Sequence, residues 1–337
     1  MGTNDRKESK EKQMKQEGYI ANTKIAVRDR KAAVLTPSQL PCLSSVPTVN
    51  LTSGCAHGCL YCYSRSYSQY PGEGKIILYE NTLRKLQEEL KRKRVKPTFV
   101  YFSPSTDVFQ PVGAVLQLAY DIFAFLLSQG IGVAFASKGI IPDEHFALFA
   151  AHQQQVRAQI GLITLNTSVV RIFEPGCAPI DTRLRQIERL IQLGIETEVR
   201  LDPILPGLTD DADNLENLFT ALRGSGVKRV ALNVLYLRPV LLEFLHKRIS
   251  DESIRKRLLE RYTPGQKIRV CSGRFSQIAL PQTERESIFR RAMNLAASYG
   301  IACHCCGCMN PDISNENCNL TGVWENGARE PQQMKLL

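Results

Sequence analysis

Hydrophobic and polar positions follow two alternating patterns through the middle of the chain. Short apolar runs, typical of buried strands, alternate with longer amphipathic stretches, typical of helices that cover a sheet. The predicted strands span residues 49–53, 98–103, 131–136, 158–165, 197–202 and 228–235. The predicted helices between them span residues 80–92, 113–129, 142–152, 181–193 and 212–224. This alternation indicates an α/β fold with a parallel sheet built from βα units.

The number of βα units decides which architecture we expect. Six units, counting a helix after the last strand, are fewer than the eight that close a full barrel. We therefore predict a partial, open (β/α)6 barrel of the TIM type. Beyond residue 235 the alternation fades, and two further helices are predicted over residues 240–262 and 284–299.

The pattern also predicts how the chain is divided. Residues 1–31 are rich in Lys, Glu and Gln, which favours a flexible basic arm, and residues 32–236 would form the barrel core. Residues 237–300 would form a helical extension, and residues 301–337 a cysteine-rich metal-binding segment and tail. The chain has no run of 18 apolar residues and no apolar stretch at its start, so we expect no membrane helix, no secretory signal and a cytoplasmic location.

The charge balance adds an anionic partner to the possibilities. The chain carries 43 Lys and Arg against 33 Asp and Glu, a formal net charge of +10. A basic surface suits nucleic acid, although proteins without such a partner also have one. The basic residues at 91–96 suit the end of a helix. Those between residues 255 and 274 lie beyond the barrel, and for these we favour an anionic partner more strongly.

Three of the eleven cysteines form a C-x3-C-x2-C motif directly after the first predicted strand. Disulfides are unusual in the cytoplasm, so metal binding is the first expectation for Cys55, Cys59 and Cys62. Three thiolates on one loop can hold three irons of a [4Fe-4S] cluster and leave the fourth iron open to a small molecule. A zinc site is the alternative, but it needs a fourth ligand, and His57 is the only candidate in the loop.

This motif, placed before an array of βα units, resembles the radical S-adenosylmethionine (SAM) superfamily. Further segments are similar to the spore photoproduct lyase group, or DNA repair photolyases, and together they cover about residues 49–235. They are Tyr61 and Tyr63 around Cys62, the segment 103–107 with Gln110 and Pro111, Ser137 with Lys138, the segment 173–176 with Pro179, Asp181 and Arg183, and the segment 203–207.

The resemblance implies a barrel of the radical SAM type with a cysteine-rich C-terminal extension, and two cofactors. These are a [4Fe-4S] cluster with an open iron and SAM, whose methionyl part binds that iron. It also implies an electron donor of the flavodoxin or ferredoxin type, and a substrate bound on the side of the helical extension. The reaction class, lyase or transferase, stays open.

The resemblance further assigns residues at the carboxyl ends of the strands, where ligands bind in parallel sheets. The expected cofactor-binding residues are Tyr61 near the adenine, Ser103, Ser105 and Asp107 near the methionyl or ribose part, Lys138 near the carboxylate, Thr164 and Asn166 near the ribose hydroxyls, and Arg200. For Arg200, a buried ion pair with Asp202 is the alternative.

One position departs from the lyase pattern. The lyase carries a hydrogen-donor cysteine just before the segment that aligns with residues 105–107, and here that position is Pro104. Repair by the same route is therefore not expected. The expected catalytic residues are Tyr63, Arg200, and Cys177 or Cys271 as substitute radical quenchers, although a single cysteine is more often a small buried hydrophobe.

A second cysteine group lies near the C-terminus. Its members are Cys303, Cys305, Cys306, Cys308 and Cys318. Because many radical SAM enzymes carry one in a C-terminal extension, we expect an auxiliary [4Fe-4S] cluster here. Closed tetrahedral zinc is the second possibility, and a docking site for a thiophilic substrate such as trivalent arsenic is the third.

Three activities are compatible with these observations. The favoured one is a radical SAM enzyme that cleaves SAM reductively and acts on a small molecule or natural product. The first alternative is a spore photoproduct lyase-like enzyme that acts on DNA, RNA or a nucleotide. The second is transfer of the aminocarboxypropyl group of SAM to a thiophilic acceptor such as arsenite. A non-enzymatic iron–sulfur or zinc protein is the least favoured interpretation.

Overall fold

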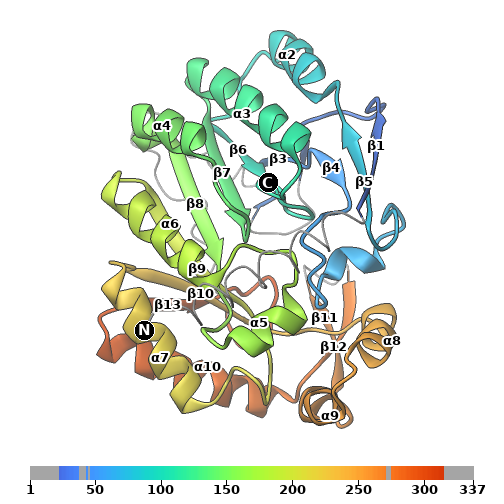
Figure 1. Ribbon diagram of the computed structural model, residues 1–337, viewed down its shortest axis with the longest axis vertical. Helices are drawn as coiled ribbons and strands as arrows, with labels where there is room; N and C mark the ends of the chain where they lie inside the picture. The colour runs from blue at the N-terminus through green and yellow to red at the C-terminus, as the bar shows by residue number, and fades with distance from the viewer. Residues whose placement is uncertain (1–22, 38–42, 45, 271–274, 315–337) are drawn as a thin grey trace, which may run out of the picture.

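A parallel sheet forms the centre of the protein (Figure 1). The computed structural model describes residues 23–37, 43–44, 46–270 and 275–314. In spatial order the sheet contains β13 (Ala302–Cys305), β10 (Arg229–Val234), β9 (Glu196–Ile204), β8 (Val156–Gly161), β7 (Gly132–Ser137), β6 (Phe99–Phe102), β3 (Pro47–Val49) and β2 (Thr36–Pro37). All neighbours are parallel except β2, which pairs antiparallel with β3.

The predicted crossover helices cover the outer face of this curved sheet (Figure 1). They are α2 (Thr82–Arg92), α3 (Gly113–Ser128), α4 (Asp143–Ala151), α6 (Ile180–Gln192), α7 (Ala212–Gly224) and α10 (Gln282–Ser298). The buried residues of α3 include Val115, Ala119 and Ile122, the spacing that places apolar side chains on one face of a helix. The predicted α/β fold with an open (β/α) barrel is confirmed.

The sheet extends beyond the six predicted strands. Strand β13 pairs with β10 through Ala302↔Arg229 to Cys305↔Leu232, so the first cysteines of the C-terminal segment belong to the barrel sheet. Helix α10 supplies the crossover, and Cys305 is buried in the main hydrophobic core. The sheet therefore includes residues on both sides of the domain boundary that we expected at residue 300.

A small second sheet departs from the prediction of a flexible arm over residues 1–31. Its strands are β1 (Lys24–Arg28), β5 (Lys75–Tyr79) and β4 (Thr52–Ser53), in the order β1-β5-β4. Backbone pairing with β5 holds β1, whose five side chains are all exposed. The hydrophobic pattern gave no signal for this strand because none of its side chains is buried. Residues 1–22 lie outside the described part of the chain.

The predicted extension contains helices and a hairpin. They are α8 (Pro239–Arg248), α9 (Glu252–Leu259), the 3-10 helix η4 (Glu260–Tyr262), and the antiparallel strands β11 (Gln266–Val270) and β12 (Phe275–Ala279). The single helix predicted over residues 240–262 is divided because Asp251 caps a new helix, accepting a hydrogen bond from the Ile254 amide at 3.0 Å. No helix in the described ranges is long and apolar enough to span a membrane.

Candidate active site

The loop that carries Cys55, Cys59 and Cys62 lies between β4 and the 3-10 helix η2 (Tyr63–Ser66). All three cysteines are free thiols and partly buried. The loop depends on Gly54, which has a φ of +81° and leaves no room for a side chain, since a Cβ would lie 2.3 Å from the Lys75 carbonyl oxygen. The glycine therefore sets the path of the chain into the first cysteine.

The segment 173–177, which begins at the end of α5 (Thr167–Phe173) and leads to α6, forms backbone hydrogen bonds with this loop. We call this segment the brace. The Leu60 amide donates to the Phe173 carbonyl at 2.9 Å, and the Gly176 amide donates to the His57 carbonyl at 2.9 Å. A Cβ on Gly176 would lie 2.6 Å from the Ala56 carbonyl oxygen. Residues 173–176, which resemble the lyase group, therefore hold the cysteine loop by backbone contacts.

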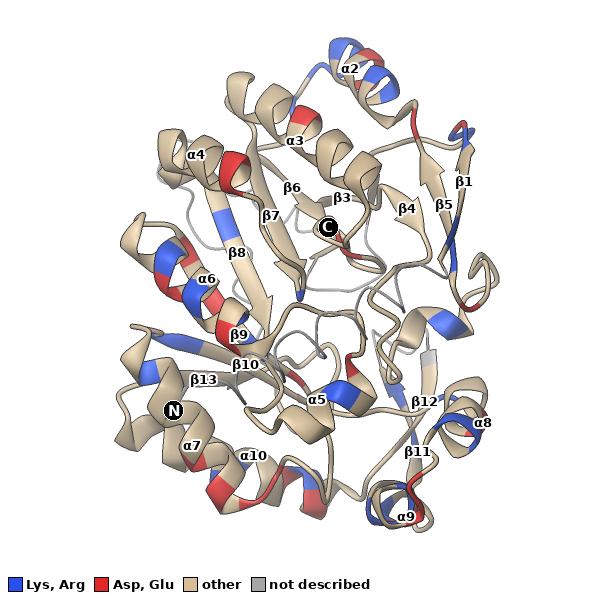
Figure 2. Cartoon of the chain, in the orientation of Figure 1, with Lys and Arg blue, Asp and Glu red and all other residues tan. Residues whose placement is uncertain are grey.

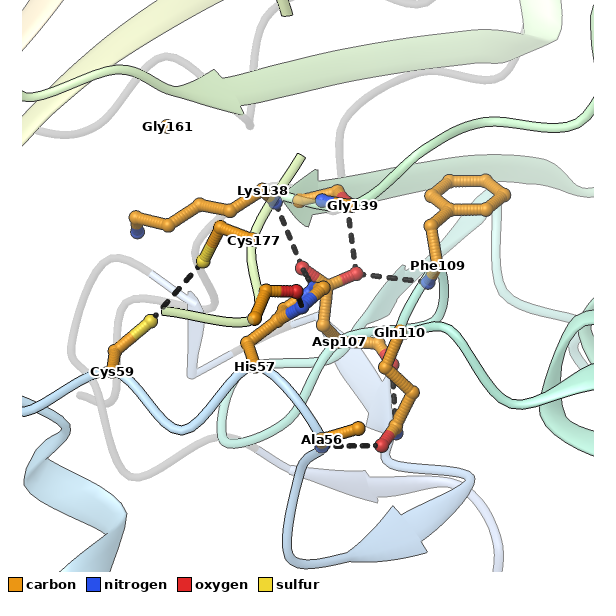
Figure 3. A network of polar contacts seen from close by, with 12 residues as sticks. Ala56, His57, Cys59, Asp107, Phe109, Gln110, Lys138, Gly139, Gly161 and Cys177 are labelled. Atoms are coloured by element: carbon orange, nitrogen blue, oxygen red, sulfur yellow. Dashed lines mark hydrogen bonds and ion pairs between the residues drawn. The ribbon is translucent and has the colours of Figure 1, made fainter. Parts of the chain in front are cut away.

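His57 is committed to structural contacts through both ring nitrogens (Figure 3). Its Nδ1 lies 2.8 Å from the Gly176 carbonyl oxygen, and its Nε2 lies 3.0 Å from Asp107 Oδ2. Burial alone would lower the pKa of His57, but the nearby Asp107 carboxylate raises it above its usual value. His57 is therefore not free to act as the fourth ligand that the zinc alternative requires.

Asp107 joins three loops at this point (Figure 3). Besides His57, it accepts hydrogen bonds from the Phe109 amide, the Ser137 hydroxyl and the Lys138 amide, each at 2.8 Å. Burial would raise the pKa of Asp107, but His57 and these donors lower it below its usual range. The geometry gives Asp107 a positioning role between the cysteine loop and the end of β7, while the cofactor contact expected from the sequence stays a prediction.

A buried ion pair lies behind the brace. Arg183 Nη1 lies 2.7 Å from Glu174 Oε2 and donates to the Gly161 carbonyl at 2.9 Å, and the side chains of Arg183 and Glu174 are fully buried. Glu174 also accepts a hydrogen bond from the Tyr61 hydroxyl. Burial would raise the pKa of Glu174, but the positive charges of Arg183 and Lys138 hold it below its usual value. Tyr61 is thus fixed in place beside the cysteines.

Cys177 lies at the end of the brace. Its Sγ is 3.4 Å from Cys59 Sγ, and the two thiols point at one another (Figure 3). The hydrogen-bond contact with Cys177 lowers the pKa of Cys59 to about 7, whereas burial raises the pKa of Cys177 well above its usual value. Ser64 makes a similar contact, with its Oγ 2.9 Å from Cys62 Sγ. The sequence singled out Cys177 but not Ser64, because a serine two residues after a cysteine carries no distinctive signal.

Two of the predicted cofactor residues, Ser103 and Lys138, have polar groups suited to a bound cofactor. Ser103 adopts a φ of +61°, rare for a residue with a side chain, and its buried hydroxyl oxygen has no hydrogen-bond partner in the described chain. The ammonium of Lys138 lies 5.7 Å from the centre of the Tyr61 ring. Burial would lower the pKa of Lys138, but Glu174 and the cysteines raise it, so the side chain stays positive. A cation beside the cysteine loop and an unpaired buried hydroxyl directly after β6 fit a cluster together with the carboxylate of SAM.

Other predicted residues make contacts within the protein. Thr164 is buried and donates to Asn214, while Asn166 caps α5 by accepting from the Ser168 and Val169 amides. The Ser105 amide donates to Asn50 Oδ1 at 3.0 Å. For these residues, the cofactor contacts expected from the sequence stay predictions.

Arg200 and Tyr63, two of the predicted catalytic residues, both make contacts within the protein. Arg200 forms the ion pair that we considered as an alternative, with its Nη2 2.5 Å from Asp202 Oδ2. Both side chains of this pair remain partly exposed. Tyr63 is exposed and its hydroxyl donates to the Pro104 carbonyl, at the position where the lyase has its hydrogen donor. Cys271 lies outside the described residues.

The second cysteine group is divided between two environments. Cys303 and Cys305 pack with the main core, whereas Cys306 and Cys308 pack with a small cluster that includes Phe99 and Tyr101. The Sγ atoms of Cys306 and Cys308 are 2.9 Å apart. Cys318 lies outside the described residues. The auxiliary cluster and its full ligand set stay predictions.

Within the described ranges, no three His, Cys, Asp or Glu side chains converge on one point as a single metal ion requires. A four-iron cluster needs no such point, because each cysteine binds a different iron. The three thiols of the first group fit that cofactor.

Comparisons with known proteins agree with this geometry. An uncharacterized protein of Mycobacterium tuberculosis, Rv2578c, is 27% identical over 213 residues, or 60% of this chain and 63% of that protein. The Radical SAM Nalpha-GlyT isomerase of Pseudomonas phage M6 is 26% identical over 267 residues, or 77% of this chain and 54% of the isomerase. The chain thus spans less than two thirds of the length of these relatives.

The similar solved structures show the fold alone, since their identities are low. A spore photoproduct lyase mutant with bound AdoMet and dinucleoside spore photoproduct gives a TM-score of 0.63 at 15% identity, covering 85% of this chain and 83% of that one. A radical SAM methyltransferase from Sphaerobacter thermophilus gives 0.50 at 18% identity, covering 78% and 66%. The Radical SAM superfamily itself matches residues 49–219, half of the chain. The cysteine loop, the parallel barrel and this match show that the chain belongs to the radical SAM superfamily.

Proposed function

We propose that this radical SAM enzyme acts on a nucleic acid or nucleotide bound between the cysteine loop and the C-terminal extension. Cys55, Cys59 and Cys62 would hold the [4Fe-4S] cluster, and Lys138 and Ser103 would contact SAM. When bound, the two cofactors supply an electron and a carbon-centred radical. The residues of the chain fix where the substrate meets them.

A basic lobe carries this proposal. We define the basic lobe as residues 237–270, which contain nine Lys and Arg against four Asp and Glu. Helices α8 and α9 and strand β11 carry these basic residues at one end of the molecule (Figure 2). The exposed ones are Lys247, Arg248, Lys256, Arg257, Lys267 and Arg269. A local excess of five positive charges suits the phosphates of a nucleic acid.

The basic lobe lies directly against the cysteine loop. Helix α8 packs on η2, and the guanidinium of Arg65 in η2 lies 4.2 Å from the centre of the Phe244 ring in α8. The Arg238 guanidinium lies 5.5 Å from the centre of the Tyr67 ring. A phosphate chain that followed the lobe would therefore run past the loop that holds the cluster. This proximity supports nucleic acid over the small molecule that the sequence favoured.

A small-molecule substrate remains the second candidate, because the barrel interior is polar. Gln159 donates to Glu198 at 2.8 Å, Asn233 donates to Asp202 at 3.2 Å, and Arg200 pairs with Asp202. Such groups could bind a compact polar molecule. The substitution of Pro104 for the lyase's hydrogen donor also fits this candidate. Transfer of the aminocarboxypropyl group is a third route, which would release methylthioadenosine.

Salt-dependent binding distinguishes the two substrate classes. We would reconstitute the holoenzyme anaerobically and measure its affinity for a short DNA duplex and for a single strand from 50 to 300 mM salt. Each phosphate contact adds about 0.9 to the log–log slope with a duplex. We expect Lys267→Ala and Arg269→Ala each to reduce the slope by about 1. The control Lys91→Ala on α2, which also removes one exposed charge, should leave it unchanged.

Two results would oppose the nucleic-acid proposal. One is binding that does not depend on salt, and the other is equal effects of Lys267→Ala and Lys91→Ala. The auxiliary cluster is tested on the same preparation by counting iron. About eight irons per chain would support two clusters, and about four irons with zinc would support a structural zinc site instead.

A further inference from the structure

Two side chains outside the predicted ligand set point at cysteines that would hold the cluster. Cys177 Sγ lies 3.4 Å from Cys59 Sγ, and Ser64 Oγ lies 2.9 Å from Cys62 Sγ. We propose that Cys177 and Ser64 are positioning residues that donate hydrogen bonds to these two sulfurs and raise the reduction potential of the cluster. The inference rests on the assignment of Cys55, Cys59 and Cys62 as its ligands.

The chemistry of the groups fixes which atom donates. A cysteine that binds iron does so as the thiolate, which has no proton and can only accept a hydrogen bond. The proton in the Cys177 contact therefore belongs to Cys177, and the proton in the Ser64 contact belongs to the hydroxyl. Cys177 is 5% exposed and Ser64 is 8% exposed, so water does not readily replace either donor.

The position of Cys177 is set by the brace. Its amide donates to the Glu174 carbonyl at 3.1 Å, and the next amide, of Ala178, donates to the Lys138 carbonyl at 2.8 Å. Figure 3 shows the Cys177 thiol directed at Cys59, with the Lys138 side chain extended on the same side. Cys177 is thus held against the ligand by its own backbone.

The same geometry argues against Cys177 as a fourth ligand. Two thiolates on one tetrahedral metal, each bound at ~2.3 Å, lie ~3.8 Å apart. The observed 3.4 Å is shorter and fits a donor and an acceptor. Thiolates on different irons of a cluster lie further apart still, because the irons separate them. Cys177 therefore contacts a ligand of the cluster, whereas the sequence suggested it as a substitute radical quencher.

Hydrogen bonds to the sulfurs change the potential because reduction adds negative charge to the cluster. A donor stabilises the reduced state more than the oxidised one, and this is a known means of setting iron–sulfur potentials. Ser64 and Cys177 approach two different sulfurs from two different segments, η2 and the brace. Their contributions should therefore be nearly additive.

The test measures the potential of the reconstituted holoenzyme without substrate, by titration followed with electron paramagnetic resonance. We expect Cys177→Ala to lower the reduced-to-oxidised ratio at a fixed potential about tenfold, equivalent to about 59 mV for one electron. Cys177→Ser keeps a donor and should stay within about threefold of the wild type. Ser64→Ala should shift the potential in the same direction, and the double variant should shift it further.

Ser66→Ala is the matched control. Ser66 is in the same 3-10 helix as Ser64, and its hydroxyl oxygen has no hydrogen-bond partner in the described chain. Its replacement should leave the potential unchanged. Unaltered potentials in both Cys177→Ala and Ser64→Ala at full iron content would overturn the proposal. Loss of iron in Cys177→Ser would also overturn it, since that would make Cys177 a ligand. Nucleic acid takes no part in this measurement, so its outcome is independent of the proposed substrate.

Discussion

Replacing Arg183 with methionine would break the ion pair behind the brace. In the wild type, Arg183 Nη1 lies 2.7 Å from Glu174 Oε2, and both side chains are fully buried. Methionine keeps much of the side-chain volume but leaves the Glu174 carboxylate without its ion-pair partner. Breaking a buried pair in this way costs about 3–5 kcal/mol. The lost hydrogen bond to the Gly161 carbonyl adds about 1 kcal/mol.

The assay is anaerobic urea unfolding of the reconstituted holoenzyme, followed by circular dichroism, with iron content measured in parallel. The double variant Glu174→Gln with Arg183→Met removes the orphaned charge, so it should recover about 2 kcal/mol of the loss in Arg183→Met. A loss below about 1 kcal/mol in Arg183→Met, or strictly additive effects in the double variant, would refute the reasoning that the pair is buried and coupled.

Three further variants test other parts of the account. Gly54→Ala should lose most of its iron, because a Cβ meets the Lys75 carbonyl at 2.3 Å, whereas Gly113→Ala, with nothing within 4 Å, should keep it. Lys138→Met should weaken SAM binding, measured by calorimetry, about tenfold or more, because a hydrogen bond to a charged group is lost. Unchanged affinity would show that Lys138 does not contact SAM. Burial lowers the pKa of His145 to about 4, so the folded state disfavours its protonation and stability is lost as the pH falls from 6.5 towards 4. Relative to His145→Leu, the wild type should lose about 2 kcal/mol between pH 7.5 and pH 5 in urea titrations, and an equal loss in both proteins would contradict this.

The sequence predicted the parts of the fold that bury apolar side chains periodically. Helix α3 begins at Gly113 as expected and ends one residue early, because its buried face has a regular spacing. Strand β1 was missed because its side chains are exposed and only its backbone is paired. Strand β13 was missed because the sequence A-C-H-C resembles a metal-binding segment more than a strand.

The part of the site that has a characteristic residue spacing was predictable. Cys55, Cys59 and Cys62 follow from a motif, and Lys138 from a resemblance. The roles of Asp107 and Glu174 were not predictable, because they depend on contacts between segments far apart in the chain: Asp107 meets His57, and Glu174 meets Tyr61, which lies 113 residues away. Only the folded barrel brings these groups together.

Reductive cleavage of SAM shows whether the three loop cysteines support radical SAM chemistry. We would reconstitute the protein anaerobically with iron and sulfide, add dithionite and SAM, and identify the nucleoside products by mass spectrometry. We expect 5′-deoxyadenosine from the wild type and none from the variant in which Cys55, Cys59 and Cys62 are all alanine. Methylthioadenosine in its place would indicate aminocarboxypropyl transfer. Equal product from both proteins, or none from a fully loaded wild type with DNA or nucleotides present, would contradict radical SAM chemistry at these cysteines.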